Sequence, residues 1–292
     1  MDFRTAAQLI ECCTQQHIPL WEAMLRREMA LFDGDRDAII ARMAHSWQIM
    51  KQSVRDSLAG DRKSMGGLIG GEAARLTSRL QAGSAISGTV SAKASAYAMG
   101  VLEVNASMGL IVAAPTAGSS GVLPGVLLAL QKEHSLDDNK IVEALFTAAA
   151  IGYLIMRNAT VAGAQGGCQA EVGAASAMAA GAAAELMGAP PDQCLAASSM
   201  ALANLLGLVC DPVAGLVEAP CQKRNAAGAA NALICAEMAL AGITERIPFD
   251  EMVEAMLQVG NRIPAELRET SLGGMAATPT ACALCQGILG GQ

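Results

Sequence analysis

Alanine-rich helical segments are the feature that most constrains how this chain can fold. Residues 170–187 read as a helix made largely of alanine and glycine. Alanine is the strongest helix former, and small side chains let neighbouring helices approach closely. Further helices are predicted over 2–16, 20–58 with a break near Gly34, 86–108, 122–132, 139–157, 191–208, 222–243 and 249–259. No run alternates apolar and polar residues long enough for a strand, so we expect an all-α protein.

The composition favours a single, tightly packed helical domain. Hydrophobic residues make up 52% of the 292 residues, while aromatic residues make up only 3% and charged residues 16%. A chain of this length could form one large domain or two small ones, and we find neither a convincing linker nor an internal repeat. The prediction is one compact multi-helix domain over 1–292, with N-terminal helices in 1–58 and a core with Gly-rich active-site loops in 59–292.

Charge and hydropathy argue against nucleic acid and membrane. The net charge is -7 and no basic block is present, so neither nucleic acid nor an anionic membrane surface is an expected partner. The uncharged stretch from Val104 to Gln131 is interrupted by Pro115, Pro124 and a Gly-Ser-Ser-Gly run. It therefore predicts a buried loop between two helices rather than a membrane span. The N-terminus lacks the basic and apolar regions of a signal peptide, which predicts a cytoplasmic protein.

Three of the nine cysteines lie at predicted helix edges, each beside glycine or proline. An odd number of cysteines without an export signal predicts reduced thiols, which suit zinc or iron–sulfur clusters. Cys168 and Cys210 are 42 residues apart (210 minus 168), and Cys221 follows after 11 more (221 minus 210). Neither zinc fingers nor ferredoxins use this spacing. Spacing alone leaves open whether the three thiols converge.

The other cysteines read as ordinary small residues. Cys12 and Cys13 are neighbours on one helix and point in different directions, which makes them poor joint ligands. Cys194 and Cys235 fall inside helices and are predicted to be core residues. The Cys282–Cys285 pair has C-x-x-C spacing but lacks the strand and helix of a redox motif.

A Gly-rich loop, Pro115-Thr116-Ala117-Gly118-Ser119-Ser120-Gly121, opens the helix that is predicted from Val122. Free N–H groups and a partial positive charge at such a helix start can bind a carboxylate. The loop does not match GxxxxGK[ST], which argues against nucleotide phosphate. A plain helix cap is the alternative, but three hydroxyls in so apolar a setting favour a ligand. The turn-rich residues 59–72 are too apolar for an exposed linker and favour a mobile loop over the site.

Several motifs resemble those of one enzyme family. They are Ser91–Ser95, Ala114–Gly121, Ala164–Glu171, Cys210–Gly215, Ala219–Asn225 and Glu269–Ala276. From about residue 60 onward the chain resembles the iron–sulfur L-serine dehydratases, in particular the alpha chain of the two-subunit form. The resemblance implies β-elimination of water from L-serine to give pyruvate and ammonia, in amino-acid degradation and gluconeogenesis. It also implies a separate beta chain, while the sequence leaves a homo- or hetero-oligomeric state open.

The same resemblance implies a [4Fe–4S] cluster with Cys168, Cys210 and Cys221 as its ligands. Three thiolates leave one iron open for the substrate hydroxyl. Some relatives end in a cysteine that folds back onto the cluster when substrate is absent. Cys282 matches that place as a fourth, regulatory ligand, although this chain continues for ten residues beyond it (292 minus 282).

A base must remove the α-proton of serine, and the sequence offers several candidates. They are Lys93, Ser95, Ser119 and Ser120, with His45 a weaker one. Desolvation could lower the pKa of Lys93, or Lys93 could pair with the substrate carboxylate, and the sequence does not separate these roles. The candidate substrate-binding residues are Thr116, Gly118, Ser119, Ser120, Asn158 and Gly167.

Three other functions stay open at this point. A cysteine desulfidase would release sulfide from L-cysteine on the same cluster, because a soft thiolate binds iron well. A pyridoxal-phosphate lyase would use Lys93 for the Schiff base and loop 116–121 for the phosphate, but it leaves the three cysteines unexplained. A cluster-carrying scaffold without activity would leave Lys93 and the Gly-Ser-Ser loop without a role.

Overall fold

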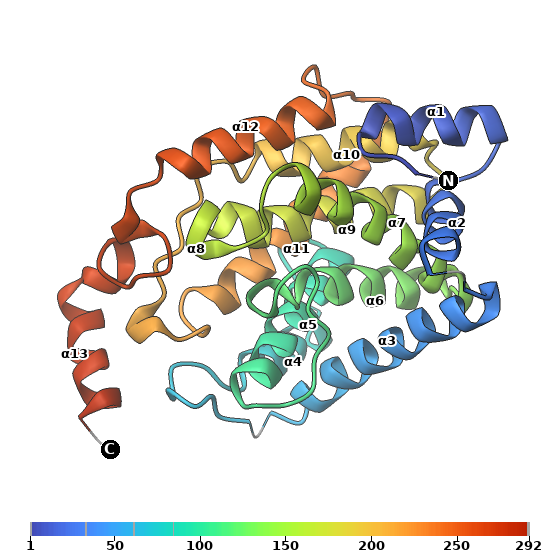
Figure 1. Cartoon of the computed structure of the whole chain (residues 1–292). Coiled ribbons are helices and arrows are strands. Elements are labelled where there is room, and N and C mark those ends of the chain that lie inside the picture. The colour runs from blue at the N-terminus through green and yellow to red at the C-terminus, as the bar shows by residue number, and fades with distance from the viewer. Residues whose placement is uncertain (1, 33, 61, 84, 291–292) are drawn as a thin grey trace.

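The computed structural model describes residues 2–32, 34–60, 62–83 and 85–290, and it is a bundle of helices (Figure 1). Within these ranges no β-strand forms, and an isolated bridge between Cys210 and Arg268 is the only strand-like pairing. The all-α prediction is therefore confirmed.

The helices follow the predicted segments closely, with breaks near Gly34 and Ala203, except over 72–81, 163–166 and 279–289, where the sequence analysis predicted none. They are α1 (Ala6–Gln16), α2 (Leu20–Phe32), α3 (Arg36–Ser57), α4 (Glu72–Gln81), α5 (Thr89–Ala106), α6 (Val122–His134), α7 (Asp138–Asn158), α8 (Gly163–Gly166), α9 (Ala174–Leu186), α10 (Pro191–Ala203), α11 (Cys221–Leu240), α12 (Phe249–Arg262) and α13 (Pro279–Leu289).

Helix α9 lies in the middle of the bundle and contacts α6, α7, α10 and α11 (Figure 1). Every residue from Ala174 to Ala184 is buried. At Gly181 the neighbouring helices come so close that a Cβ atom would overlap Ile151 and lie 2.6 Å from the Ser198 hydroxyl. The small residues of this helix therefore allow the whole bundle to pack around it.

The N-terminal helices share this core. Helix α2 packs on α7, and α3 packs on α5 and α7. The indole of Trp47 donates to Asp138 at 3.0 Å, and Lys51 pairs with the same carboxylate at 2.6 Å. Trp47, Met50 and Val54 are all buried, so they form an apolar stripe of α3 that faces the protein. One hydrophobic cluster extends from Phe3 to Met256.

The second half of the long uncharged stretch is part of the core, whereas Met108 and Leu110 in its first half are exposed. Residues Val122 to Leu130 of α6 are all buried. Among the described helices, α7 has the length and apolar character that could span a membrane, but 67% of the relevant window is buried inside the protein. Such burial is typical of a core helix.

Close contacts between α5 and α6 bring the Gly-rich loop to one end of the bundle. A Cβ atom on Gly121 would overlap the carbonyl of Ala98, and one on Gly125 would lie 2.7 Å from the carbonyl of Ala94. Because these glycines let α6 lie directly on α5, loop 116–121 is held at the end of the bundle where α8 leads into α9.

We predict that Gly181→Val lowers the free energy of unfolding by about 3 kcal/mol, because the added side chain has no space between α7, α9 and α10. Urea unfolding measures this change. Gly287→Ala is the matched control, since its Cβ would meet nothing within 4 Å in exposed helix α13. The control should shift stability by no more than about 1 kcal/mol. Equal midpoints for Gly181→Val and the wild type would contradict this description of the core.

Candidate metal centre

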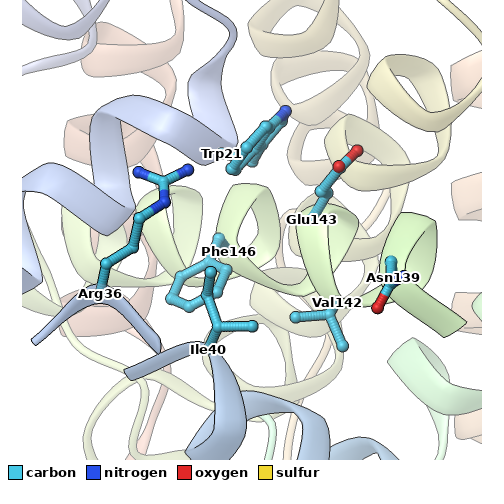
Figure 2. A pocket seen from close by; sticks show the side chains of 7 residues that line it. All are labelled: Trp21, Arg36, Ile40, Asn139, Val142, Glu143 and Phe146. Atoms are coloured by element: carbon cyan, nitrogen blue, oxygen red, sulfur yellow. The ribbon is translucent and has the colours of Figure 1, made fainter. Parts of the chain in front are cut away.

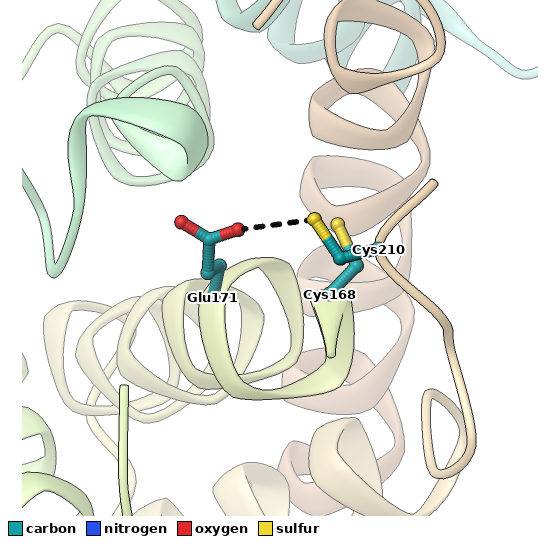
Figure 3. Close-up of side chains that lie close together, drawn as sticks. All are labelled: Cys168, Glu171 and Cys210. Atoms are coloured by element: carbon teal, nitrogen blue, oxygen red, sulfur yellow. Dashed lines mark hydrogen bonds between the residues drawn. The ribbon is translucent and has the colours of Figure 1, made fainter. Parts of the chain in front are cut away.

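Two thiols and a carboxylate meet where α8 leads into α9. The ligand atoms of Cys168, Glu171 and Cys210 all lie within 4.8 Å of one another (Figure 3). Cys168 and Glu171 are three residues apart and project from the same side of one helical turn. Cys210 approaches from a separate segment, and its Sγ lies 3.9 Å from Glu171 Oε2.

The backbone around Cys168 is shaped for this meeting. Gly167 has a φ of 73°, and a Cβ there would lie 2.8 Å from the carbonyl of Leu208. Only glycine fits such a position without strain. A π-helical turn over Gln169–Gly173 follows, a feature that often occurs at functional sites.

The side chain of Gln169 joins two further segments to this turn. Its Oε1 accepts from Gly207 N–H at 2.9 Å, and its Nε2 donates to the carbonyl of Met256 at 2.9 Å. Its own backbone N–H donates to the carbonyl of Leu208 at 2.9 Å. These bonds hold the segment before Cys210 against Cys168.

The C-terminal motif holds Cys210 from the other side. Cys210 N–H donates to Leu267 at 2.8 Å, and Glu269 N–H donates to the Cys210 carbonyl at 2.7 Å. Asp211 accepts from Met275 N–H at 2.7 Å. The motif at residues 269–276 is thus part of the support for Cys210.

Arg224 places a positive charge beside the thiols. It pairs with Asp211 at 2.8 Å and donates to the carbonyl of Val209 at 2.7 Å. The pKa of Cys168 is lowered, first by its hydrogen bond with Cys210 and also by the charge of Arg224, against the effect of burial. The pKa of Cys210 is raised, mainly because its thiol keeps its proton in the hydrogen bond with Cys168.

Cys221, the first residue of α11, borders on this pair. Burial raises its pKa to about 12, and the negative charges of Cys168 and Glu171 add to that effect. The structure therefore brings the three predicted thiols to one end of the bundle, although Cys221 lies outside the 4.8 Å group.

Loop 116–121 forms another wall of the centre. Thr116 Oγ1 donates to Glu171 Oε1 at 2.7 Å and lies 3.1 Å from the Ser119 hydroxyl. Ser119 and Ser120 are fully buried, and the Ser120 hydroxyl donates to the Ala117 carbonyl at 2.8 Å. Gly118 faces Glu171, with its Cβ position 3.1 Å from Oε1.

Asn225 joins this loop to Cys221. Its Nδ2 donates to the carbonyls of Gly118 at 2.8 Å and Cys221 at 2.9 Å. Its Oδ1 accepts from Gly121 N–H at 3.0 Å. The buried amide therefore fixes the Gly-rich loop relative to the third thiol.

Glu171 is a candidate functional residue that the sequence analysis missed. Burial raises the pKa of this carboxyl, and the hydrogen bond from Thr116 opposes that effect. One signal was present, because Glu171 is the only charged residue between Asn158 and Glu185. A single carboxyl group in so apolar a segment, three residues from a cysteine, is hard to explain by packing and favours a functional role. Arg224 and Asn225 had no comparable signal beyond their place in a quoted motif.

Two of the candidate bases lie away from the centre. Lys93 pairs with Glu133 at 3.0 Å, near the end of α6 opposite to loop 116–121. That end is about 18 Å along the helix from Gly121. Ser95 donates to the carbonyl of Ala226 at 3.4 Å, between α5 and α11.

Three other candidates also point elsewhere. Asn158 is exposed and donates to the carbonyl of Arg4 at 2.9 Å. His45 is exposed on α3. Cys282 is exposed on α13, and its thiol lies 3.9 Å from the carbonyl of Ala276.

A separate cavity lies between α2, α3 and α7 (Figure 2). It is lined by Trp21, Arg36, Ile40, Asn139, Val142, Glu143 and Phe146. Its charged groups are already paired, Arg36 with Glu22 at 2.7 Å and Glu143 with Lys140 at 2.8 Å. No cysteine is among these lining residues, so this cavity is separate from the candidate metal centre.

The fold and the centre together define an all-α protein with a buried thiol site of the kind that suits soft metals. The family model for the serine dehydratase alpha chain matches residues 15–276. The chain belongs to the serine dehydratase alpha chain family.

Individual relatives agree with this membership. The chain is 46% identical over 289 residues to the probable L-serine dehydratase, alpha chain, of Bacillus subtilis, covering 99% of this chain and 96% of the relative. It is 44% identical over 276 residues to the L-serine dehydratase, alpha chain, of Peptoniphilus asaccharolyticus, covering 94% of each. It is 36% identical to L-serine dehydratase 2 of Escherichia coli, covering 96% of this chain but only 62% of that longer protein.

We predict that Asn225→Ala lowers the free energy of unfolding by about 3 kcal/mol, because three hydrogen bonds between buried groups are lost together. Denaturant unfolding of the metal-free protein measures this change. Asn139→Ala, at an exposed position on α7, is the control and should change stability by less than about 0.5 kcal/mol. Similar changes in the free energy of unfolding for the two variants would mean that Asn225 does not hold the loop.

Proposed function

We propose that this chain is a lyase that removes water from L-serine and releases pyruvate and ammonia. The observation that carries the proposal is the meeting of Cys168, Cys210 and Glu171 beside Cys221 and a Gly-rich loop, in a member of the serine dehydratase alpha chain family. Elimination gives aminoacrylate and water. Aminoacrylate then tautomerises and takes up water to form pyruvate and ammonia without further catalysis.

We further propose that Cys168, Cys210 and Cys221 hold a [4Fe–4S] cluster. The donor set fits this group, because the three thiols are buried together and the positive charge of Arg224 favours thiolate at Cys168. With three thiolate ligands such a cluster supplies one open iron, a Lewis acid for the departing hydroxyl. Reduced thiols are needed to bind it, which supports a cytoplasmic location. Cys282 stays a proposed regulatory ligand, and reaching the cluster would require α13 to move.

Loop 116–121 is the proposed site for the substrate carboxylate. The N–H groups of Ala117 and Gly118 lie at the start of a helical turn, next to the hydroxyl of Thr116, whereas those of Ser119, Ser120 and Gly121 bond within the protein. The Ser119 and Ser120 hydroxyls are engaged within the loop, so we assign them to shaping it rather than to removing a proton. Gly118 and Gly167 contribute close backbone packing.

Glu171 is our proposed base for the α-proton. Thr116 holds Oε1 at 2.7 Å and orients the carboxylate, so Oε2 remains on the side of the thiols. A carboxylate positioned there can take the α-proton while the hydroxyl departs. This assignment replaces Lys93, which pairs with Glu133 instead.

The proposed partner is a separate beta chain. Relatives of similar length are named alpha chains, and the Escherichia coli protein is longer than this chain. We therefore expect full activity only when the companion chain is present. The relatives' names do not support a cysteine desulfidase, and Lys93 lies too far from loop 116–121 for the pyridoxal-phosphate alternative.

We predict that Cys168→Ala, purified without oxygen, loses both bound iron and serine-dependent pyruvate formation, because one thiolate ligand is gone. Iron analysis and a pyruvate assay with the partner chain measure these losses. Cys235→Ala removes an equally buried thiol from the middle of α11 and should keep both. Full activity in Cys168→Ala would exclude the proposed cluster.

We predict that Glu171→Gln keeps its iron but lowers kcat by about 100-fold or more, because the amide cannot take a proton. Iron content and steady-state pyruvate formation measure the two effects separately. Glu143→Gln, on the far side of α7, serves as the control. A kcat within a few-fold of the wild-type value would mean that another group is the base.

A further inference from the structure

Glu218 is a buried carboxylate that the proposed mechanism does not use. It lies three residues before Cys221 and is 2% exposed. Its Oε2 accepts from the Ser64 hydroxyl at 2.5 Å and from Leu68 N–H at 3.0 Å. Its Oε1 accepts from Gly66 N–H at 2.7 Å. Backbone N–H groups that converge on one anion in this way hold it firmly.

These three bonds attach a distant turn, residues 64–69, to the segment that leads into Cys221. Gly66 touches this segment so closely that a Cβ atom would overlap Leu216 and lie 2.9 Å from Glu218 Oε1. On its other side the turn is joined to α5, because Met65 N–H donates to the Ala106 carbonyl at 2.9 Å.

The same segment also borders the candidate metal centre. Val217 lies 3.6 Å from the Cβ position of Gly118, whose other neighbour is Glu171 at 3.1 Å. Residues 216–218 therefore lie between the 64–69 turn on one side and the Gly118 wall of the site on the other.

A second attachment follows one residue after Cys221. Gln222 is fully buried, and its Nε2 donates to Glu72 Oε2 at 3.2 Å and to Glu103 Oε1 at 2.9 Å. Glu72 Oε2 in turn accepts from Gly70 N–H at 2.6 Å. Both ends of the turn are thus attached to the residues that flank Cys221. The loop over 59–72, which the sequence analysis predicted to be a mobile cover, is therefore anchored by the bonds of residues 64–72.

We propose that Glu218 is a positioning residue: its bonds to the 64–69 turn hold residues 216–218 in place beside the Gly118 wall of the substrate site and orient the segment that carries Cys221. This inference rests on the proposed function, because it assigns residues 216–218, supported by the turn, to serine binding. Loosening the turn should weaken substrate binding more than it slows the chemical step.

The test compares Glu218→Gln with the wild type. The amide must direct an NH₂ group at one of three donors, so at least one hydrogen bond is lost. We expect the KM for serine to rise about tenfold, as for the loss of one such bond, while kcat and iron content change little. Trypsin should cut after Arg62 or Lys63 about tenfold faster in the metal-free protein, because proteolysis follows local opening.

Two further variants make the test specific. Ser64→Ala removes the hydroxyl bond to Glu218 and the bond that this hydroxyl accepts from Ile69 N–H at 3.2 Å, and it leaves the two backbone bonds to Glu218 in place, so it should cause a shift in the same direction. The double variant Ser64→Ala/Glu218→Gln should shift KM and cleavage by less than the sum of the two single effects, because the two residues share one interaction. Glu254→Gln, on the exposed face of α12, is the matched control and should leave both KM and cleavage unchanged. If Glu218→Gln does not fold, Ser64→Ala carries the test alone.

The outcomes separate this inference from the proposed function. Unchanged trypsin cleavage in Glu218→Gln and Ser64→Ala overturns the anchoring role, whatever the activity. Faster cleavage with an unchanged KM overturns the link to substrate. A wild type without serine turnover, even with its partner chain, overturns the proposed function and with it the substrate role of the turn, while the cleavage assay still decides whether Glu218 anchors it.

Discussion

Close packing around α9 is the constraint on which the rest of the structure depends. Its small side chains allow α6, α7, α10 and α11 to approach it, and at Gly181 no space remains even for a methyl group. In an interior packed this densely, the displacement of one side chain also displaces its neighbours, because no empty space absorbs the movement. The candidate metal centre lies at the N-terminal end of this helix, where the chain enters α9 through Cys168. The densely packed helix α9 therefore supports the turn that carries Cys168.

Buried polar side chains carry this rigidity into the loops around the centre. Gln169, Asn225, Gln222 and Glu218 each join segments that are distant in the sequence. Gln169, Asn225 and Glu218 bond to backbone groups of these loops, which are costly to leave without partners when buried. Gln222 instead donates to the carboxylates of Glu72 and Glu103. The site is consequently specified by hydrogen bonds more than by apolar contacts, which suits a reaction that requires both a proton acceptor and a carboxylate site in fixed positions.

The cysteines of this chain show how environment divides one residue type into two roles. Burial raises the pKa of Cys194 inside α10, and it raises that of Cys13 in α1 to about 12, so both remain thiols that pack like small apolar residues. At Cys168 the hydrogen bond with Cys210 and the nearby charge of Arg224 outweigh burial and lower the pKa. Thiolate is the form that binds metal, and these neighbours favour it at Cys168, whereas the pKa values of Cys210 and Cys221 are raised.

The sequence by itself determined the helical class, most helix positions and the family motifs, because helix propensity and apolar periodicity are local properties. It also singled out Cys168, Cys210 and Cys221 through their place beside glycine and proline. Only the tertiary structure decided what surrounds them. Lys93 looked suitable as a base in its own helix but pairs with Glu133, whereas Glu171 looked unremarkable and lies among the thiols. Contacts between segments some forty residues apart depend on how helices pack, and a local pattern in the chain does not encode them.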